Sequence, residues 1–317
     1  MINFILRRLL WAIPTLIGVG VVAFVIIHIA PGGPALALAG ENATPARVAQ
    51  ITHQLGLDRP LQVQLYVWFV GLLHGDLGYS YQRQESVRSL IAQRLPQTLL
   101  LMGGALLVSI LIAIPLGVYQ AARRNTTFDR IASLGVFAAW SMPTFWFGTL
   151  LIAIFAVSLR WMPVGGLQSI DTLSFDWPSR FAHLVLPAAT LAIVSVAGWS
   201  RYVRGSMIEQ LREDYARTAT SKGLTPRIVL FKHVLRNALI PFITVMGSTL
   251  PALFGGAIIT EQIFAYPGMG QLFWQAATDR DFAILLGMTM ITGTLVILGN
   301  LVADVLYGVV DPRVRYD

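Results

Sequence analysis

Few side chains of this 317-residue sequence have the types and spacings that catalysis requires. The chain has no cysteine, which excludes thiolate metal sites and cysteine nucleophiles. Its five histidines are scattered, and no two have the spacing of a metal-ligand pair. A phosphate-binding loop needs lysine followed by serine or threonine, but Lys222 and Lys232 precede glycine and histidine. We therefore expect no catalytic residue, metal or cofactor in this chain, and no enzyme activity of its own.

Three polar residues near apolar runs are candidates for a translocation path or gate: Glu261, Asn300 and Asp304. Charged residues at membrane depth are costly and often functional. For Glu261, the favoured alternative is an interfacial carboxylate bonded to the turn that follows it, residues 266–270. Asn300 and Asp304 are four residues apart and share a helix face. A structural contact with the region of Arg313 or with the next helix is the favoured explanation for them.

Residues 204–237 form a long, basic connection between two apolar runs, and their turn chemistry predicts a defined shape. Residues 214–222 can form a short helix, which Gly223 can end in a left-handed conformation. Thr225 and Pro226 suit the cap and the first position of a second helix. The connection is therefore expected to fold as a helix, a glycine turn and a second helix.

Small side chains mark one surface of this connection. Ala216, Ala219 and Gly223 fall on nearby faces and would let a partner approach closely, with charges such as Arg217 and Lys222 around them. An ordinary basic loop at the membrane edge explains the same residues. Spacing alone does not decide between a partner surface and such a loop.

Long apolar runs must position all of these residues. Hydrophobic residues make up 55% of the sequence and charged residues 12%, too few charges for a water-facing surface. Because a membrane-crossing helix needs about 20 mainly apolar residues, the sequence predicts an all-α polytopic membrane protein. The six predicted spans are Leu9–Ile29, Thr98–Val118, Leu134–Val157, Leu184–Val203, Ala238–Ile259 and Phe282–Val310. Pro143 should kink the third of these spans.

The basic residues are distributed unevenly among the connections between these spans. The net charge is +7, and arginine and lysine concentrate at the amino terminus, in the second–third and fourth–fifth connections, and in the tail. The positive-inside rule then places both termini in the cytoplasm. Since topology explains the charge, we expect membrane lipid around the chain and no nucleic acid partner.

Residues 31–96 form a long segment on the opposite side of the membrane. A helix is expected after Thr44, an apolar helix too short to span over residues 61–73, and a third helix that Ser86 caps and that stops before Pro96. A helical lid and a structured spacer both fit this segment. The expected division is an amino-terminal helix with this segment (1–96), a transmembrane core containing the connection 204–237 (97–310), and a cytoplasmic tail (311–317).

The connection 204–237 resembles the coupling-loop signature of ABC importer permeases, and more narrowly that of the first permease of the dipeptide/oligopeptide transport family. The similar residues are 214–224 and 232–241, in which Ala219, Gly223 and Leu235 match the general family pattern. Four positions depart from that pattern: Arg217, Thr218, His233 and Arg236. The general pattern has Glu-Ala-Ala in the place of Arg217, Thr218 and Ala219. The departures therefore put a side-chain role for that glutamate in doubt, but not the helix–turn–helix shape.

The resemblance extends over nearly the whole chain. Each further fragment is weak evidence for the family when taken alone. The order of the fragments and the spans between them make the whole set specific to it. These fragments are Gly56–Pro60, Gly75–Gly78, Ser141–Trp146, Glu261–Gly270, Asn300, Asp304, Tyr307 and Asp311–Arg313.

The resemblance implies a type I ABC importer permease fold in the bacterial inner membrane. It also implies partners: a second, homologous permease, two ATP-binding subunits that hold ATP and Mg²⁺, and an extracytoplasmic substrate-binding protein. ATP-driven closure of the ATP-binding subunits would rock the permeases between inward- and outward-facing states. The residues implied in coupling to the ATP-binding subunits are Asp214, Tyr215, Ala216, Arg217, Thr218, Ala219, Lys222, Gly223, Leu224, His233 and Leu235.

The implied function is ATP-driven import of dipeptides or oligopeptides by alternating access. The same architecture in related permeases imports glutathione, nickel complexes or oligosaccharides. An ion-coupled transporter or channel is a different class, and it would need ionisable residues inside several spans, of which these have few. An intramembrane enzyme would need a nucleophile–base pair that the spans do not offer.

Overall fold

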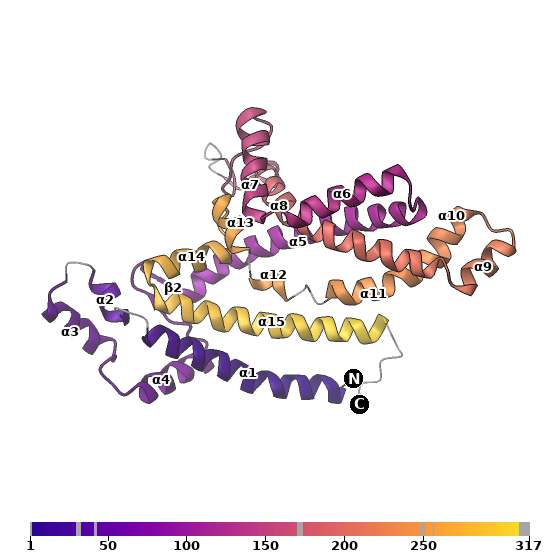
Figure 1. Ribbon diagram of the computed structural model, residues 1–317. Coiled ribbons are helices and arrows are strands. Elements are labelled where there is room, and N and C mark those ends of the chain that lie inside the picture. Colours follow the sequence, from indigo (N-terminus) through magenta and orange to yellow (C-terminus); the bar gives the residue numbers. More distant parts are fainter. Residues whose placement is uncertain are drawn as a thin grey trace.

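A computed structural model of the protein describes residues 2–29, 33–40, 43–169, 174–247, 249, 251–255 and 257–310 (Figure 1). The expected tail, residues 311–317, lies outside this part of the chain. The elements are α1 (Ile2–Ile29), α2 (Gly33–Ala39), α3 (Pro45–Gln54), α4 (Leu61–Leu73), β1 (Tyr79–Ser80), β2 (Glu85–Ser86), α5 (Val87–Ala122), α6 (Thr127–Ser141), α7 (Thr144–Leu151), the π-helix η1 (Ile152–Ser158), α8 (Trp177–Gln210), α9 (Asp214–Ser221), α10 (Pro226–Ile228), the π-helix η2 (Val229–Val234), α11 (Leu235–Gly247), α12 (Ala252–Gly255), α13 (Ile258–Ile263), α14 (Met269–Asp279) and α15 (Phe282–Val310).

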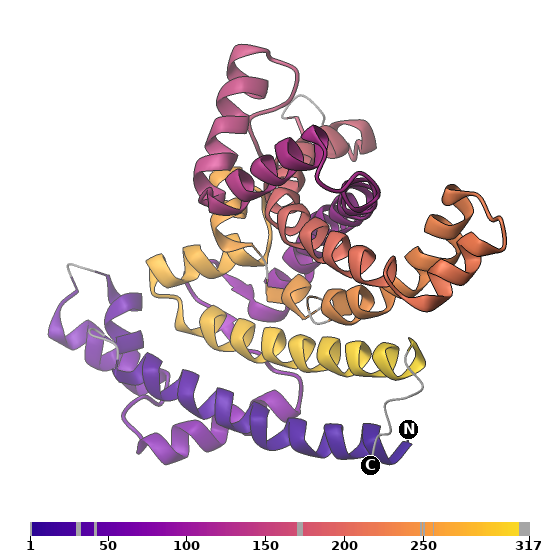
Figure 2. The same ribbon diagram turned by 45° about the vertical axis from the view of Figure 1, so that its right-hand side comes forward.

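Long helices run between two ends of the molecule. α1 and α15 lie side by side, and α5 packs along α8 with α6 against them (Figures 1 and 2). α9 and α10 lie at one end, on the right of Figure 1, and α2 and α3 lie at the other. We call these the α9 end and the α3 end.

The described residues contain five helices that are long and apolar enough to cross a membrane, or six if α6 and the α7–η1 segment form one bent span. The predicted first and last spans end where α1 and α15 end, at Ile29 and Val310. α8 covers the predicted fourth span and continues beyond it at both ends, so the connection 204–237 begins inside α8. The helical membrane architecture is therefore confirmed, and the larger differences are at the second, third and fifth predicted spans.

The second span begins earlier than predicted. Ser86 caps the helix as expected, because its side chain accepts a hydrogen bond from the Ser89 amide at 3.3 Å. The helix does not stop before Pro96, however, but continues through Pro96 and Pro115 to Ala122 as α5. Within a helix a proline removes one hydrogen bond, and neighbouring helices can compensate for the freed carbonyl. On either side of Pro96, Leu95 packs on the cluster of α14 and Thr98 bonds to Glu261, contacts that stabilise the helix through this proline.

The third span is broken rather than kinked. α6 ends at Ser141, Met142 is extended with φ −80° and ψ 132°, and α7 begins at Thr144 after Pro143. The two helical segments meet at 106°. The residue before a proline is disfavoured in the α conformation, which explains why the break falls at Met142.

The fifth span is displaced towards the amino terminus. A continuous apolar helix runs from Pro226 to Gly247, made of α10, η2 and α11. The predicted stretch Ala238–Ile259 is instead divided among α11, α12 and α13. Pro251 lies just before α12, where a residue without an amide hydrogen suits a helix start. Residues 226–237, about a third of the predicted loop 204–237, therefore belong to this candidate span.

The segment before α5 contains the expected helices and one feature that was not predicted. Thr44 caps α3, with its hydroxyl accepting from the Arg47 amide at 3.3 Å, and α4 covers the apolar run that was too short to span. The two short strands β1 and β2 pair antiparallel, Tyr79 opposite Ser86 and Ser80 opposite Glu85. α5 also passes without a break through the boundary expected at residues 96 and 97.

Candidate functional site

The α9 end has the predicted helix, glycine turn and second helix. α9 ends where the Lys222 amide donates to the Thr218 carbonyl at 3.1 Å and the Gly223 amide donates to the Thr220 carbonyl at 2.9 Å. Gly223 has φ +79°, in the left-handed region, and no atom lies within 4 Å of the position that a Cβ would take. The backbone angle, rather than lack of space, therefore requires glycine at this turn.

The second helix starts at Pro226, as predicted, but without the expected side-chain cap. Thr225 has the extended backbone of a cap residue, and its side chain makes no capping hydrogen bond. The helix then continues as the π-helix η2, whose Val229 and Val234 are buried. Thr225 therefore contributes through its backbone conformation alone, and the prediction of a side-chain cap is wrong.

Ala216 and Ala219 do not form a surface that a partner could touch. They are 3% and 6% exposed and belong to a cluster with Val203, Met207 and Val234 of the same chain. Their small side chains let α9 pack closely on α8 and η2. Ala216 and Ala219 are therefore small because they pack inside this chain, and not because a partner protein approaches them.

The outward surface of α9 is polar. Asp214 and Arg217 form an ion pair at 3.5 Å, with side chains 96% and 71% exposed. Thr218, Lys222 and Gly223 are also exposed. These are the coupling candidates that a second protein could contact directly.

The remaining coupling candidates hold α9 in place from within the chain. The Tyr215 hydroxyl donates to Gln210 Oε1 at 2.7 Å, across the turn from α8 to α9. Leu224 and Leu235 pack against the buried cluster of Ala216 and Ala219. His233 is half-buried. Apart from His233, the eleven candidates thus divide into an exposed set and a set that positions it.

An ion pair between α8 and α6, with its carboxylate buried, was not predicted. Arg204 of α8 binds Asp129 of α6 through two hydrogen bonds, Nε to Oδ1 at 2.8 Å and Nη2 to Oδ2 at 2.7 Å. The Asn125 amide also donates to Asp129 Oδ2, at 3.0 Å. Asp129 is 3% exposed. Such a two-point pair fixes the α5–α6 turn to the helix that leads into α9.

Glu261 is fully buried and bonded to the turn that follows it. The Thr98 hydroxyl donates to its Oε1 at 3.0 Å, and the Gln271 amide donates to its Oε2 at 2.9 Å. The Thr98 hydroxyl also accepts from the Met269 amide at 2.7 Å. The carboxylate therefore faces the amino-terminal amides of α14, an arrangement that favours a negative charge. This is the structural role that we favoured, and no described contact connects Glu261 with Asn300 or Asp304.

The turn around Glu261 is packed too closely for larger residues. A Cβ at Gly268 would overlap the Glu261 carboxylate, and one at Gly270 would lie 2.7 Å from the backbone of Ile258. Burial raises the pKa of Tyr266 to about 12, and the Glu261 carboxylate adds to that shift. The neutral Tyr266 hydroxyl donates to the Gln97 carbonyl at 3.3 Å.

Asn300 and Asp304 do not form a polar stripe inside the described bundle. Asn300 is exposed. Asp304 forms an ion pair with Arg8 of α1, with Arg8 Nη2 3.1 Å from Asp304 Oδ2. The structural contact that we favoured is thus made with α1. The expected contact with Arg313 lies outside the described residues.

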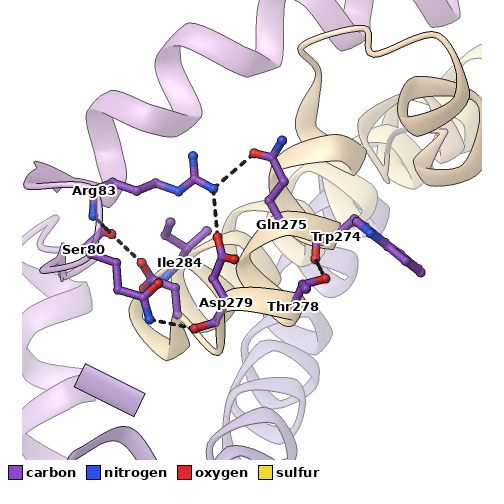
Figure 3. A network of polar contacts seen from close by, with 9 residues as sticks. Ser80, Arg83, Trp274, Gln275, Thr278, Asp279 and Ile284 are labelled. Atoms are coloured by element: carbon purple, nitrogen blue, oxygen red, sulfur yellow. Dashed lines mark hydrogen bonds and ion pairs between the residues drawn. The ribbon is translucent and has the colours of Figure 1, made fainter. Parts of the chain in front are cut away.

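The β1–β2 hairpin is attached to the turn between α14 and α15 (Figure 3). The Ser80 hydroxyl donates to Asp281 Oδ2, whose other oxygen accepts from the Ile284 amide at 3.3 Å. Arg83 Nη2 lies 3.1 Å from Gln275 Oε1 and 3.4 Å from Asp279 Oδ2. Residues about two hundred positions apart therefore meet here, and no local sequence pattern predicts such pairs.

Comparison with known proteins gives a family for the whole chain. Residues 113–316 match the family described as binding-protein-dependent transport system inner membrane component, and residues 1–102 match the amino-terminal part described for such membrane components. The chain is 42% identical to the oligopeptide transport system permease protein AppB of Bacillus subtilis (strain 168), over 100% of both chains. It is 39% identical to the dipeptide transport system permease protein DppB of Escherichia coli (strain K12), over 100% of this chain and 99% of the relative.

A solved structure supports the fold. A chain of the MetNI methionine ABC transporter, in an inward-facing conformation, has a TM-score of 0.55 and 19% identity, and the match covers 71% of this chain and 97% of that one. At this identity the likeness concerns the fold alone, and it confirms the predicted type I importer architecture. Together with the family match, it shows that this multi-pass membrane protein belongs to the binding-protein-dependent transport system inner membrane component family of ABC permeases.

Proposed function

We propose that this chain is a permease subunit of an ATP-driven importer that moves dipeptides or oligopeptides into the cytoplasm by alternating access. The observation that carries the proposal is full-length similarity to the oligopeptide and dipeptide permeases of two distant bacteria. A di/tripeptide transport system permease protein of Pseudomonas aeruginosa, 41% identical over 100% of this chain, adds to it. In this proposal the protein lies in the bacterial inner membrane with both termini in the cytoplasm.

The transporter would contain four further proteins. A second, homologous permease would complete the path, two ATP-binding subunits would supply the energy, and a binding protein outside the cytoplasmic membrane would deliver the peptide. Neither lysine of this chain has the neighbours of a phosphate-binding loop, which supports a separate motor that holds ATP and Mg²⁺. The permease itself would catalyse no chemical step.

α9 would be the point at which an ATP-binding subunit pushes on the permease. Its exposed face offers Asp214, Arg217, Thr218 and Lys222 to a partner, while Ala216 and its neighbours lock the helix onto α8. A push on α9 would therefore reach α8 through packed side chains and, through Arg204, reach α6 as well. Rigid transmission of this kind suits rocking of whole helices.

The first experiment tests the function itself. The chain is co-expressed with the permease, ATP-binding and binding-protein genes encoded next to it, and the purified complex is reconstituted in liposomes. We expect uptake of labelled dipeptide or tripeptide that requires ATP and the binding protein. Glutathione, nickel complexes and oligosaccharides are tested as alternative substrates. Uptake of one of these without uptake of peptides would show that it, and not a peptide, is the substrate. A chain that binds no ATP-binding subunit, or that transports along an ion gradient, would refute it.

A second experiment tests the role of α9 through Gly223→Val. Valine at φ +79° is strained by roughly 1–3 kcal/mol. Gly75→Val is a matched control, because Gly75 has φ +80°, equally open surroundings and a place at the α3 end. We expect both variants to insert and to lose similar stability. Only Gly223→Val should lose co-purification with the ATP-binding subunits or uncouple ATP hydrolysis from uptake. Equal transport by the two variants would contradict the role of α9.

A further inference from the structure

A cavity of about 440 Å³ lies at the α3 end, in the size range of small-ligand sites. Its walls come from the last turns of α1, from α2, α3 and α4, from the β1–β2 hairpin and from the first turns of α15. Since α1 ends and α15 begins here, the cavity lies where two candidate spans leave the apolar layer. The polar side chains that line it are His28, His53, Gln54, Arg59, Gln64, Tyr79, Tyr81, Arg280 and Asp281.

Two arginines of the cavity wall have no partner in the described part of the chain. The guanidinium of Arg59 lies over Gly56, and that of Arg280 projects from a residue with φ +56° at the end of α14. Neither forms an ion pair among the described residues. The carboxylate in the described wall is Asp281, and its two oxygens are bonded to Ser80 and to the Ile284 amide. The two positive charges are therefore not neutralised from within the described chain.

His28 lines the same wall and is bonded on both sides of its ring. Its Nδ1 lies 2.8 Å from the Phe24 carbonyl oxygen and its Nε2 lies 3.0 Å from Gln64 Oε1. The orientation of Gln64 is fixed, because its amide nitrogen donates to the carbonyls of Leu57 at 3.0 Å and Arg59 at 2.8 Å. Both ring nitrogens of His28 therefore have partners within the chain, which fixes the orientation of the ring in the wall.

The rest of the wall is apolar. Phe24, Ile27, Trp68 and Leu286 line it, and the ring of Phe24 stacks on that of His28 with centroids 3.9 Å apart. α4, which forms one side, is almost entirely apolar, and none of its residues is buried in the described structure. Two arginines in one wall with apolar side chains, a tryptophan and tyrosines match the chemistry of a phospholipid at the membrane interface.

We propose that this cavity is a binding site for one anionic phospholipid, whose phosphate lies between Arg59 and Arg280 and whose acyl chains follow Trp68 and α4. The glycerol and phosphate groups supply the acceptors that these guanidinium groups lack. In the proposed orientation of the chain, the lipid belongs to the outer leaflet. The inference requires the membrane placement of the family but no particular transported substrate, so it stands or falls separately from peptide import.

The test compares lipid binding by variants of the complete, co-purified transporter. After delipidation in detergent, the complex is titrated with short-chain phosphatidylglycerol or phosphatidylcholine, and bound lipid is counted by native mass spectrometry together with the melting temperature. We expect phosphatidylglycerol to bind and to raise the melting temperature, and phosphatidylcholine to do so weakly. Arg59→Gln with Arg280→Gln should weaken phosphatidylglycerol binding by about tenfold or more.

Arg47→Gln is the matched control. Arg47 lies on α3, is exposed and bonded to Gln50, and does not line the cavity, so its loss changes net charge at the same end without touching the site. Equal binding of the two lipids, or equal loss of binding in the Arg47 variant, would overturn the proposal. Inorganic phosphate or dialanine that displaces phosphatidylglycerol at equal concentration would also overturn it, because the site would then recognise a free anion or a peptide carboxylate.

Discussion

Two buried carboxylates of this permease are stabilised in different ways. Asp129, near the α9 end, is 3% exposed and bonded to the guanidinium of Arg204. Glu261 is fully buried, and none of the described ion pairs includes it; its partners are backbone amides and the Thr98 hydroxyl. The Asp129 carboxylate is thus bonded to an arginine side chain of another helix. The Glu261 carboxylate is bonded to backbone amides of the turn that it stabilises.

The difference indicates what each carboxylate does. An arginine pair joins two helices that remain separate elements, α6 and α8, and keeps them together if they rotate as one. Amide partners fix the conformation of a single turn, between α13 and α14, and leave the carboxylate no freedom. We therefore expect mutations at Asp129 and Arg204 to affect coupling as well as stability, and mutations at Glu261 to affect stability above all.

Arg204→Leu should have the largest effect. It leaves the Asp129 charge buried without its cation, for which a loss of about 3–5 kcal/mol is typical. Thermal unfolding in detergent should show a large decrease in melting temperature. The control is the double variant Asp129→Leu/Arg204→Leu, which removes both charges and should recover much of the loss. If the double variant is as unstable as the single one, the pair is not what holds α6 to α8.

Gly268→Ala should have the next largest effect. The added methyl group overlaps the Glu261 carboxylate, and overpacking of this kind costs about 1–3 kcal/mol. Gly103→Ala is a matched control in α5, because no atom lies within 4 Å of its Cβ position. Melting temperatures of the two variants should therefore differ clearly. Equal melting temperatures would show that the turn has room to relax.

Glu261→Gln should have a smaller effect of about 1–2 kcal/mol. The amide retains the shape of the carboxylate but places a donor against one of the donors that surround Glu261. The melting temperature should fall while the ratio of peptide uptake to ATP hydrolysis stays unchanged. A changed ratio of uptake to ATP hydrolysis would contradict this purely structural role and indicate that Glu261 acts in the gate.

Asp214→Asn should leave the melting temperature unchanged. Its pair with Arg217 lies at 3.5 Å between two exposed side chains, and such surface pairs contribute little to stability. The same variant should weaken co-purification with the ATP-binding subunits if α9 is their contact. Unchanged stability together with unchanged association would remove Asp214 from the proposed interface.

Continuous apolar runs and turn residues could be read from the sequence. Both ends of α15 and of α4 fall at the predicted residues, because each apolar run is bounded by polar or turn-forming neighbours. The left-handed conformation of Gly223 at the end of α9 was also predicted, since such a helix end strongly favours glycine. Local chemistry decides such features, so local sequence predicts them.

Features that depend on packing could not be predicted in the same way. Pro96 and Pro143 look alike in the sequence, yet α5 continues through one and the chain breaks before the other. The helix–helix contacts of α5 decide that outcome. Asp129 and Arg204 are 75 residues apart, and only the packing of α6 on α8 brings them together. The same packing buries Ala216 and corrects the interpretation of its small side chain.

The attachment of the hairpin to the α14–α15 turn has a consequence for biosynthesis. Ser80 and Asp281 are 201 residues apart in the chain. At about 5–20 residues per second, the ribosome makes the second partner roughly 10–40 s after the first. During that interval the hairpin exists without its attachment, while the helices between are still entering the membrane. Contacts of such long range form late in folding, so this attachment should close only when the last span is in place.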